Sequence, residues 1–116
     1  MTTIAENSGL VTAINVFTVD PSNQQKLLDL LARATDTSVR DAPGFVSAAL
    51  HRSLDGTRVT MYAQWRSAEH YQRYQATRSN PSASPYVAEI LAIAKVELGT
   101  YAVVKVFAGS SGPAVD

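Results

Sequence analysis

The sequence predicts an α+β fold, in which helices cover one antiparallel sheet. The chain of 116 residues suits a single domain, because domains typically hold about 100 to 150 residues. Runs rich in Val, Ile, Thr and Phe alternate with runs of helical periodicity in the order β, α, β, β, α, (α), β. An Asp-Gly pair lies between the two adjacent β-prone runs, as in a hairpin turn. This order is that of the ferredoxin-like split βαβ plan with an antiparallel sheet.

The first strand is predicted over Leu10–Val19, and it stops before Pro21, which cannot donate a hydrogen bond to a ladder. Asp20 is a favourable N-cap residue, and proline is favourable at the first position of a helix. Apolar residues then recur at helical spacing. We therefore expect a helix from about Pro21 to Arg40.

Two further strands are predicted over Phe45–Leu54 and Arg58–Arg66. Both runs are rich in residues that favour strands, and Asp55 and Gly56 stand between them. Asp-Gly between two β-prone runs is a strong local signal for a hairpin. We expect these two strands to pair directly.

The length of the hairpin loop decides which side chains share a face of the sheet, since a shift of one residue turns every side chain over. A three-residue loop, Leu54–Gly56, places His51 on the same face as Trp65. A two-residue loop of Asp55 and Gly56 separates them. With the three-residue loop, the shared face carries Phe45, Ser47, Ala49 and His51 beside Trp65, Ala63, Met61 and Val59. That face would form a weakly polar pocket with aromatic walls.

The second half of the chain adds helices and a last strand. A helix is predicted over Ala68–Arg78, with Ser67 as its cap, and another helical stretch over about Ser84–Ala94. Glu97–Ala108, rich in Val and aromatic residues, is expected to form the last strand.

Composition narrows the classes of protein to which the chain can belong. Residues 1–8 and 109–116 are small and polar or rich in Gly, Ser and Pro, so we expect flexible ends around one domain at 9–108. Ten basic residues balance ten acidic ones without a basic stripe, which argues against a nucleic-acid partner. No run of apolar residues is long enough to span a membrane, and a cytoplasmic location is expected. The chain has no cysteine and no histidine spacing typical of metal ligands, so no metal is expected.

The predicted sheet is apolar on both faces, although the helices can cover only one of them. In the first strand, Ile14 and Val16 alternate with Ala13 and Phe17. A large exposed apolar face is uncommon in a monomer. We therefore expect a homodimer in which the open sheet faces of two copies pack together.

Few side chains in the sequence suit a functional site. Asn15 interrupts an apolar strand, and burying an unpartnered amide costs about 1 to 3 kcal/mol. It is either a donor aimed at a ligand, a satisfied core amide, or a polar group in the dimer seam. Trp65, the single tryptophan, is a core residue or a wall of the site, and Tyr71 and Tyr74 either face the same pocket or cover the sheet edge.

Four segments of the chain resemble the antibiotic biosynthesis monooxygenase family over about Leu10–Phe107. They are Asn15-Val16-Phe17-Thr18-Val19, Pro43-Gly44-Phe45, Asp55-Gly56-Thr57 and Tyr62-Ala63-Gln64-Trp65-x-Ser67. Within that family the chain is most similar to small cofactor-independent oxygenases of aromatic polyketide pathways. The resemblance implies a dimeric α+β barrel. It also implies that an anthrone-type phenol is oxidised to a quinone with O₂ as co-substrate and with no cofactor.

The resemblance also implies roles for individual residues. Asn15 would be an oxyanion donor and Trp65 an orienting or hydrogen-bonding group. His51 and Tyr71 would each take an acid/base or substrate-contact role. The residues expected to contact the substrate are Tyr71, Met61, Tyr74, Phe45 and Phe17. Met61 departs from the family pattern, because quinone-forming members carry an asparagine four residues before the tryptophan.

Two other functions remain open at the level of the sequence. The same pocket would also serve a polyketide cyclase or isomerase, which performs enolate chemistry without O₂. It would equally serve a dimer that binds an aromatic ligand without turning it over.

Overall fold

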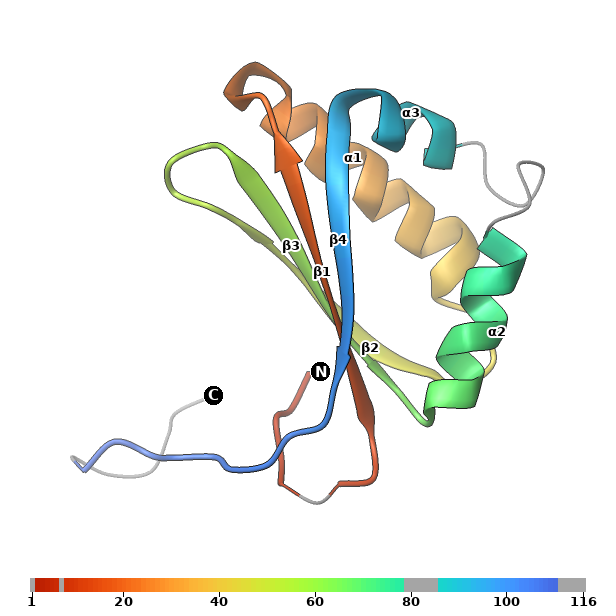
Figure 1. Cartoon of the computed structure of the whole chain (residues 1–116), viewed down its shortest axis with the longest axis vertical. Coiled ribbons are helices and arrows are strands. Elements are labelled where there is room, and N and C mark those ends of the chain that lie inside the picture. The colour runs from red at the N-terminus through yellow and green to blue at the C-terminus, as the bar shows by residue number, and fades with distance from the viewer. Residues whose placement is uncertain (1, 7, 79–85, 111–116) are drawn as a thin grey trace.

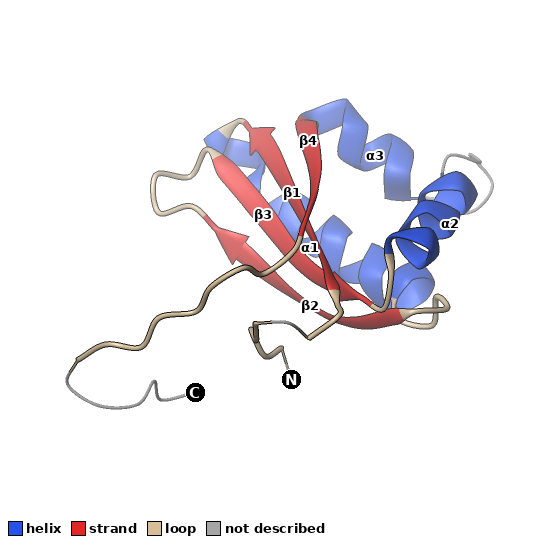
Figure 2. Cartoon of the chain, turned by 60° about the horizontal axis from the view of Figure 1, so that its bottom comes forward, coloured by secondary structure: helices blue, strands red, loops and turns tan. Residues whose placement is uncertain are grey.

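The computed structural model describes residues 2–6, 8–78 and 86–110 of the chain. They form a twisted sheet with all its helices on one side (Figures 1 and 2). In chain order the elements are β1 (Val11–Val19), a 3-10 turn (Pro21–Asn23), α1 (Gln24–Ala34), a π-helical turn (Thr35–Val39), β2 (Phe45–Arg52), β3 (Arg58–Trp65), α2 (Ala68–Arg78), α3 (Tyr86–Ile93) and β4 (Ala94–Tyr101). Neighbouring strands are antiparallel in the order β2-β3-β1-β4. The predicted α+β, ferredoxin-like architecture is confirmed.

The first helical region begins at the predicted place and extends almost to the predicted end. The Asp20 carboxylate accepts hydrogen bonds from the backbone N–H of Ser22 at 3.0 Å and from its hydroxyl at 2.7 Å, which starts the 3-10 turn. Leu27 and Leu31 of α1 are then buried against the sheet. The last turn is π-helical, because the N–H of Arg40 reaches back five residues to the carbonyl of Thr35 at 2.8 Å.

The hairpin forms, but its loop has four residues instead of three. The N–H of Ser53 donates to the carbonyl of Arg58 at 2.9 Å, which leaves residues 54–57 as the loop. An even number of loop residues turns His51 away from the face that carries Trp65, and His51 pairs with Thr60. The prediction that His51 stands beside Trp65 is therefore wrong, and the imidazole is exposed on the other face.

An irregularity at the start of β2 restores part of the predicted face. The register shifts between Phe45 and Ser47, so that Phe45 lies opposite Trp65 whereas Ser47 lies opposite Gln64. The Phe45 ring consequently packs edge-on against the indole, with centroids 5.4 Å apart. Phe45 thus reaches Trp65 through a bulge and not through the loop length that we predicted.

The last strand lies earlier in the chain than predicted. β4 begins at Ala94, directly after α3, and ends at Tyr101, which pairs with Thr12 near the first residue of β1. Beyond that point β1 offers almost no further backbone for pairing. Residues 102–108, predicted as strand, instead lead away from the sheet in an extended path (Figure 2). We call this segment the C-terminal arm.

The two faces of the sheet differ sharply in how they are covered. Side chains of α1 and α3 pack on one face against a core that includes Phe17, Val59 and Met61. The opposite face carries partly exposed Ile14 and Val16 near its centre. At one end of this open face, the Gln64 amide donates to a backbone carbonyl of the N-terminal segment at 2.6 Å. No helix in the described part of the chain is long and apolar enough to cross a membrane.

Candidate active site

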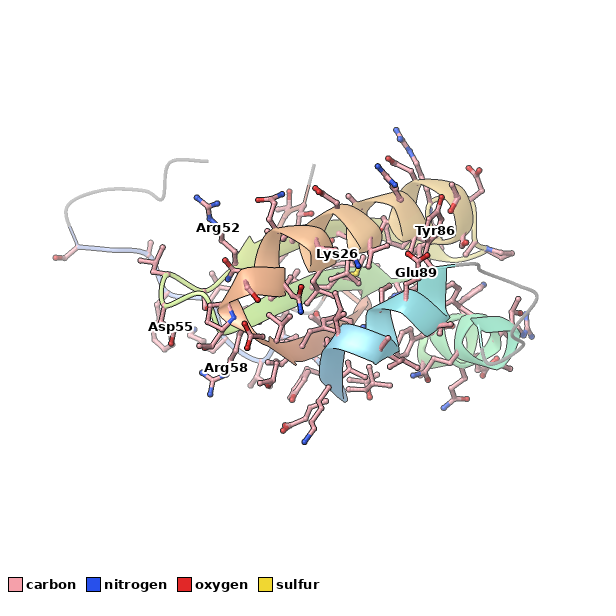
Figure 3. All side chains as sticks on the ribbon, turned by 90° about the horizontal axis from the view of Figure 1, so that it is seen from above. Lys26, Arg52, Asp55, Arg58, Tyr86 and Glu89 are labelled. Atoms are coloured by element: carbon pink, nitrogen blue, oxygen red, sulfur yellow. The ribbon has the colours of Figure 1, made fainter. Side chains whose placement is uncertain are left out.

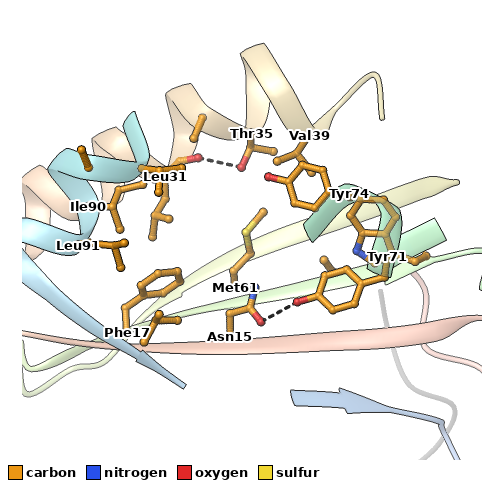
Figure 4. A pocket seen from close by; sticks show the side chains of 16 residues that line it. Asn15, Phe17, Leu31, Thr35, Val39, Met61, Tyr71, Tyr74, Ile90 and Leu91 are labelled. Atoms are coloured by element: carbon orange, nitrogen blue, oxygen red, sulfur yellow. Dashed lines mark hydrogen bonds between the residues drawn. The ribbon is translucent and has the colours of Figure 1, made fainter. Parts of the chain in front are cut away.

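A cavity of about 490 Å³ lies between the helices and the covered face of the sheet (Figure 4). This volume is in the range of small-molecule sites, which hold about 300 to 1,000 Å³. Its lining is mostly aliphatic and aromatic, and the polar members are Asn15, Thr35, Trp65, Tyr71 and Tyr74. Leu91 on its rim is 55% exposed, so the cavity opens to solvent near α3.

The floor of the cavity comes from alternate residues of β1 and β3. Asn15 and Phe17 point up from β1, because residues two apart in a strand share a face. Met61 lies directly opposite Asn15 in the strand pairing, and Trp65 follows four residues later on the same face of β3. The antiparallel register thus brings residues from both strands of the sheet centre to one site.

The roof comes from the end of α1, the π-helical turn and α3. Thr35 and Val39 reach the cavity from the π-helical turn, and Ile90 and Leu91 reach it from α3. The Thr35 hydroxyl donates to the carbonyl of Leu31 at 2.8 Å, so its proton is engaged within the helix. The signal in the sequence for these residues was the helical spacing of apolar side chains, which does not distinguish a cavity wall from ordinary core.

Asn15 is 6% exposed and takes part in a short chain of hydrogen bonds with α2. The Tyr71 hydroxyl donates to Asn15 Oδ1 at 3.4 Å, and Gln75 Nε2 donates to the Tyr71 oxygen at 3.3 Å. The amide is therefore a partnered group at the floor of the cavity.

Trp65 is 1% exposed and surrounded by aromatic rings. The rings of Tyr71 and Tyr74 lie 5.5 Å and 5.2 Å from it, centroid to centroid. Its Nε1–H is buried and has no hydrogen-bond partner among the described residues. A buried donor without an acceptor costs about 1 to 3 kcal/mol. Because Trp65 also lines the cavity, its N–H is a candidate donor to a bound ligand.

No Asp, Glu, His, Lys or Arg lines the cavity within the described ranges 2–6, 8–78 and 86–110. Charged side chains lie elsewhere: Arg52, Asp55 and Arg58, for example, gather at the hairpin end of the molecule (Figure 3). His70, the other histidine, is engaged with the Ser67 hydroxyl at 2.7 Å at the start of α2. The same described ranges contain no cluster of three or more His, Cys, Asp or Glu side chains that could hold a metal ion.

The structure brings together most of the residues singled out in the sequence. The cavity is lined by Asn15, Phe17, Met61, Trp65, Tyr71 and Tyr74. Phe45, predicted to contact substrate, packs against the indole and lies outside the lining. His51 is on the opposite face of the sheet and does not belong to the site.

Comparison with known proteins shows the family of the chain. Residues 10–83 match the antibiotic biosynthesis monooxygenase family. Over 86 residues the chain is 42% identical to tetracenomycin-F1 monooxygenase of Streptomyces glaucescens, a match that covers 74% of each chain.

Two similar solved structures come from the same bacterial genus. A monooxygenase from the gene ActVA-Orf6 of Streptomyces coelicolor, in complex with the ligand nanaomycin D, has a TM-score of 0.71 and 28% identity, covering 86% of this chain and 92% of its own. SnoaB, a cofactor-independent oxygenase from Streptomyces nogalater, has a TM-score of 0.67 and 26% identity, covering 84% of this chain and 95% of its own. The predicted resemblance and enzyme class are confirmed, and the chain belongs to the antibiotic biosynthesis monooxygenase family.

Proposed function

We propose that this monooxygenase oxidises a polycyclic aromatic phenol, an anthrone-type polyketide intermediate, to a quinone with O₂ and without a cofactor. The observation that carries the proposal is that the indole N–H of Trp65 has no partner among the described residues, while Trp65 and the Asn15 amide both line a mostly apolar cavity. A flat aromatic ring with oxygen atoms along one edge fits that distribution of polar and apolar groups. The relatives that act on tetracenomycin F1 or bind nanaomycin D support the same substrate class.

The reaction uses the substrate itself as the reductant of O₂. The ionised ring gives one electron to O₂, and the resulting substrate radical and superoxide combine to form a C–O bond. The hydroperoxide then loses water as its O–O bond and the remaining C–H bond break, which leaves a carbonyl. The ring carbon loses four electrons in total, and the two atoms of O₂ become the carbonyl oxygen and the oxygen of water.

The protein contributes electrostatic stabilisation and the exclusion of water. Negative charge spreads onto the phenol oxygen when the ring ionises, and N–H donors of Asn15 and Trp65 would stabilise it there. Such donors act strongly in a site of low polarity, because few water dipoles compete with them. Phe17 and Met61 would hold the ring by contact with its faces.

The described lining holds no carboxylate, imidazole or amine that would act as a base. We propose that the substrate proton passes to solvent through the opening near α3, or is lost before binding. In that case the rate follows the acidity of the phenol, and substrates with more acidic phenols reach full rate at lower pH.

Oxygen uptake by the purified, metal-free protein tests the proposal, with the anthrone dithranol as substrate. We expect stoichiometric consumption of O₂ and appearance of the quinone. Turnover that continues at the same rate without O₂ would instead identify a cyclase or isomerase. Tight binding without product would identify a ligand-binding protein, and either outcome would overturn the proposal.

We also propose that two copies pack through their open sheet faces. Ile14 and Val16 lie on that face, and the C-terminal arm exposes 83% of both Val104 and Phe107. Apolar side chains so exposed favour burial against a second copy, and a net charge of zero does not oppose self-association. Sedimentation equilibrium at micromolar concentration tests this, and a monomer there would contradict it.

A further inference from the structure

We propose that Gln75 and Tyr71 act as positioning residues, which orient the Asn15 amide so that its NH₂ group faces the cavity. This inference rests on the proposed function and specifies which end of Asn15 meets the substrate. An asparagine side chain presents either a carbonyl oxygen or an amide nitrogen, and a half-turn about its last bond exchanges them. Only the nitrogen end stabilises an anionic oxygen.

The order of donors and acceptors in the chain of hydrogen bonds fixes this orientation. Gln75 Nε2 can only donate, so the Tyr71 oxygen accepts at 3.3 Å. The hydroxyl proton of Tyr71 then points onward to Asn15 Oδ1 at 3.4 Å, an atom that can only accept. With Oδ1 engaged on the α2 side, Nδ2 is the end left for the cavity.

Met61, the neighbour of Asn15 on β3, leaves the N–H groups of Asn15 Nδ2 available to a ligand. Met61 lies directly opposite Asn15, and both side chains project into the cavity (Figure 4). A thioether sulfur is a weak acceptor and competes poorly for an amide N–H. Met61 therefore does not accept a hydrogen bond from the Asn15 amide. A side chain with an oxygen acceptor at position 61 would accept one, and the N–H group would then not be available to a ligand.

The geometry of α2 explains why these two residues act together. Tyr71 and Gln75 are four residues apart, so they lie on one side of the helix, one turn from each other. Tyr71 is 4% exposed and packs on the Trp65 ring, which holds its hydroxyl in place beside Asn15. We call the hydrogen bonds from Gln75 to Tyr71 and from Tyr71 to Asn15 the relay. It connects α2 to the middle of β1 across 56 positions of sequence.

Replacing Gln75 by Glu tests the relay, because the new carboxylate accepts where the amide donated. Tyr71 would then turn its proton toward the carboxylate, and Asn15 Oδ1 would lose its donor. We expect Gln75→Glu to lower kcat about tenfold with KM changed less than about twofold, since the amide matters most when charge develops on the oxygen. Gln72→Glu, exposed on the same helix, adds the same charge and should change neither constant.

Ligand binding separates this role from a general loss of packing and does not depend on turnover. 1,8-Dihydroxyanthraquinone carries oxygen acceptors, whereas anthracene has the same ring system without a polar atom. We expect Gln75→Glu to weaken the quinone about fivefold or more and to leave anthracene unchanged. Equal weakening of both ligands, or no weakening of the quinone, would overturn the inference.

Two further variants keep the test decisive if Gln75→Glu fails to fold. Tyr71→Phe removes the hydroxyl that donates to Asn15 Oδ1 without adding charge, and the same loss of quinone affinity is expected. Gln75→Leu removes only the donor to the Tyr71 oxygen, so a smaller loss is expected. Absence of oxygen uptake with every phenol would refute the proposed function, while the pair of ligands would still decide the orientation of Asn15.

Discussion

The Asn15 amide sits in the middle of an apolar strand and is the first residue whose presence the proposed chemistry explains. We predict that Asn15→Ala lowers turnover at least about tenfold, because one oxyanion donor commonly contributes two to three orders of magnitude in rate. Steady-state oxygen uptake measures this. Asn15→Asp, which keeps the shape but repels an anion, should fall as far. A near wild-type rate in either variant would remove Asn15 from the site.

Trp65 is the second residue whose substitution we expect to lower turnover. Trp65→Phe retains an aromatic ring against Phe45 and Tyr71 but removes the unpaired N–H. We predict a loss of turnover of at least about tenfold, while the protein keeps its fold by circular dichroism. Tyr74→Phe, which leaves the indole in place, provides the comparison. Unchanged turnover in Trp65→Phe would show that the N–H has no part in the reaction.

For His51 we expect that substitution leaves activity unchanged, since the side chain is exposed on the other face of the sheet. We predict that His51→Ala changes kcat/KM by less than about twofold at every pH between 6 and 9. Measurements with one substrate across that range check it. A tenfold loss confined to the alkaline or acidic side would mean that the imidazole reaches the substrate after all.

These three residues also show how far the sequence alone can specify a site. Asn15 and Trp65 could be found because each is an unusual residue in its strand. The alternation of side chains along a strand then predicts which face of the sheet each of them occupies. His51 was misplaced because the face of β2 depends on the number of loop residues, and an Asp-Gly pair does not fix that number. The chain of hydrogen bonds through Gln75 left no signal at all, since it depends on how α2 packs on the sheet.

At the scale of elements, the stability of the β2–β3 turn depends on pH through the Asp55 carboxylate. The Asp55 carboxylate accepts hydrogen bonds from the hydroxyl and N–H of Thr57 and from the hydroxyl of Ser53, and these lower its pKa to about 2. A carboxyl whose folded pKa is lowered stabilises the fold above its unfolded pKa of about 4. That contribution is lost as the pH falls from about 4 toward 2.

We predict that Asp55→Asn lowers the melting temperature at pH 7 and flattens the decline in stability between about pH 4 and pH 2. Thermal unfolding followed by circular dichroism across that range measures both effects. Asp41→Asn, an exposed carboxylate in another loop, serves as the control. A variant whose acid denaturation matches that of the wild type would contradict the role of the turn.

Element boundaries followed the sequence where local chemistry sets them and departed where tertiary pairing does. The first helix starts at Asp20 and Pro21 as predicted, because capping is local. The last strand starts earlier and ends at Tyr101, because β1 supplies no more partner backbone beyond that point. The Val-rich arm has strand propensity without a strand to pair with in a single copy.

At the scale of the whole molecule, the proposed dimer depends on the open sheet face that carries Ile14 and Val16. We predict that Val16→Lys, at the centre of the open face, raises the dimer dissociation constant at least about tenfold, because burying an unpaired ammonium is costly. Sedimentation velocity at several concentrations measures it. Gln72→Lys on the exposed side of α2 is the matched control. An unchanged dissociation constant would move the interface elsewhere.

The aliphatic walls of the cavity have one more consequence. Apolar cavities in proteins bind nonpolar gases such as xenon without any specific polar contact. Dioxygen is likewise a small nonpolar gas, and the region between Phe17, Leu31 and Ile90 offers it a place to dissolve beside the ring. The oxidant then needs no docking residue of its own, and its delivery depends on free space in the walls.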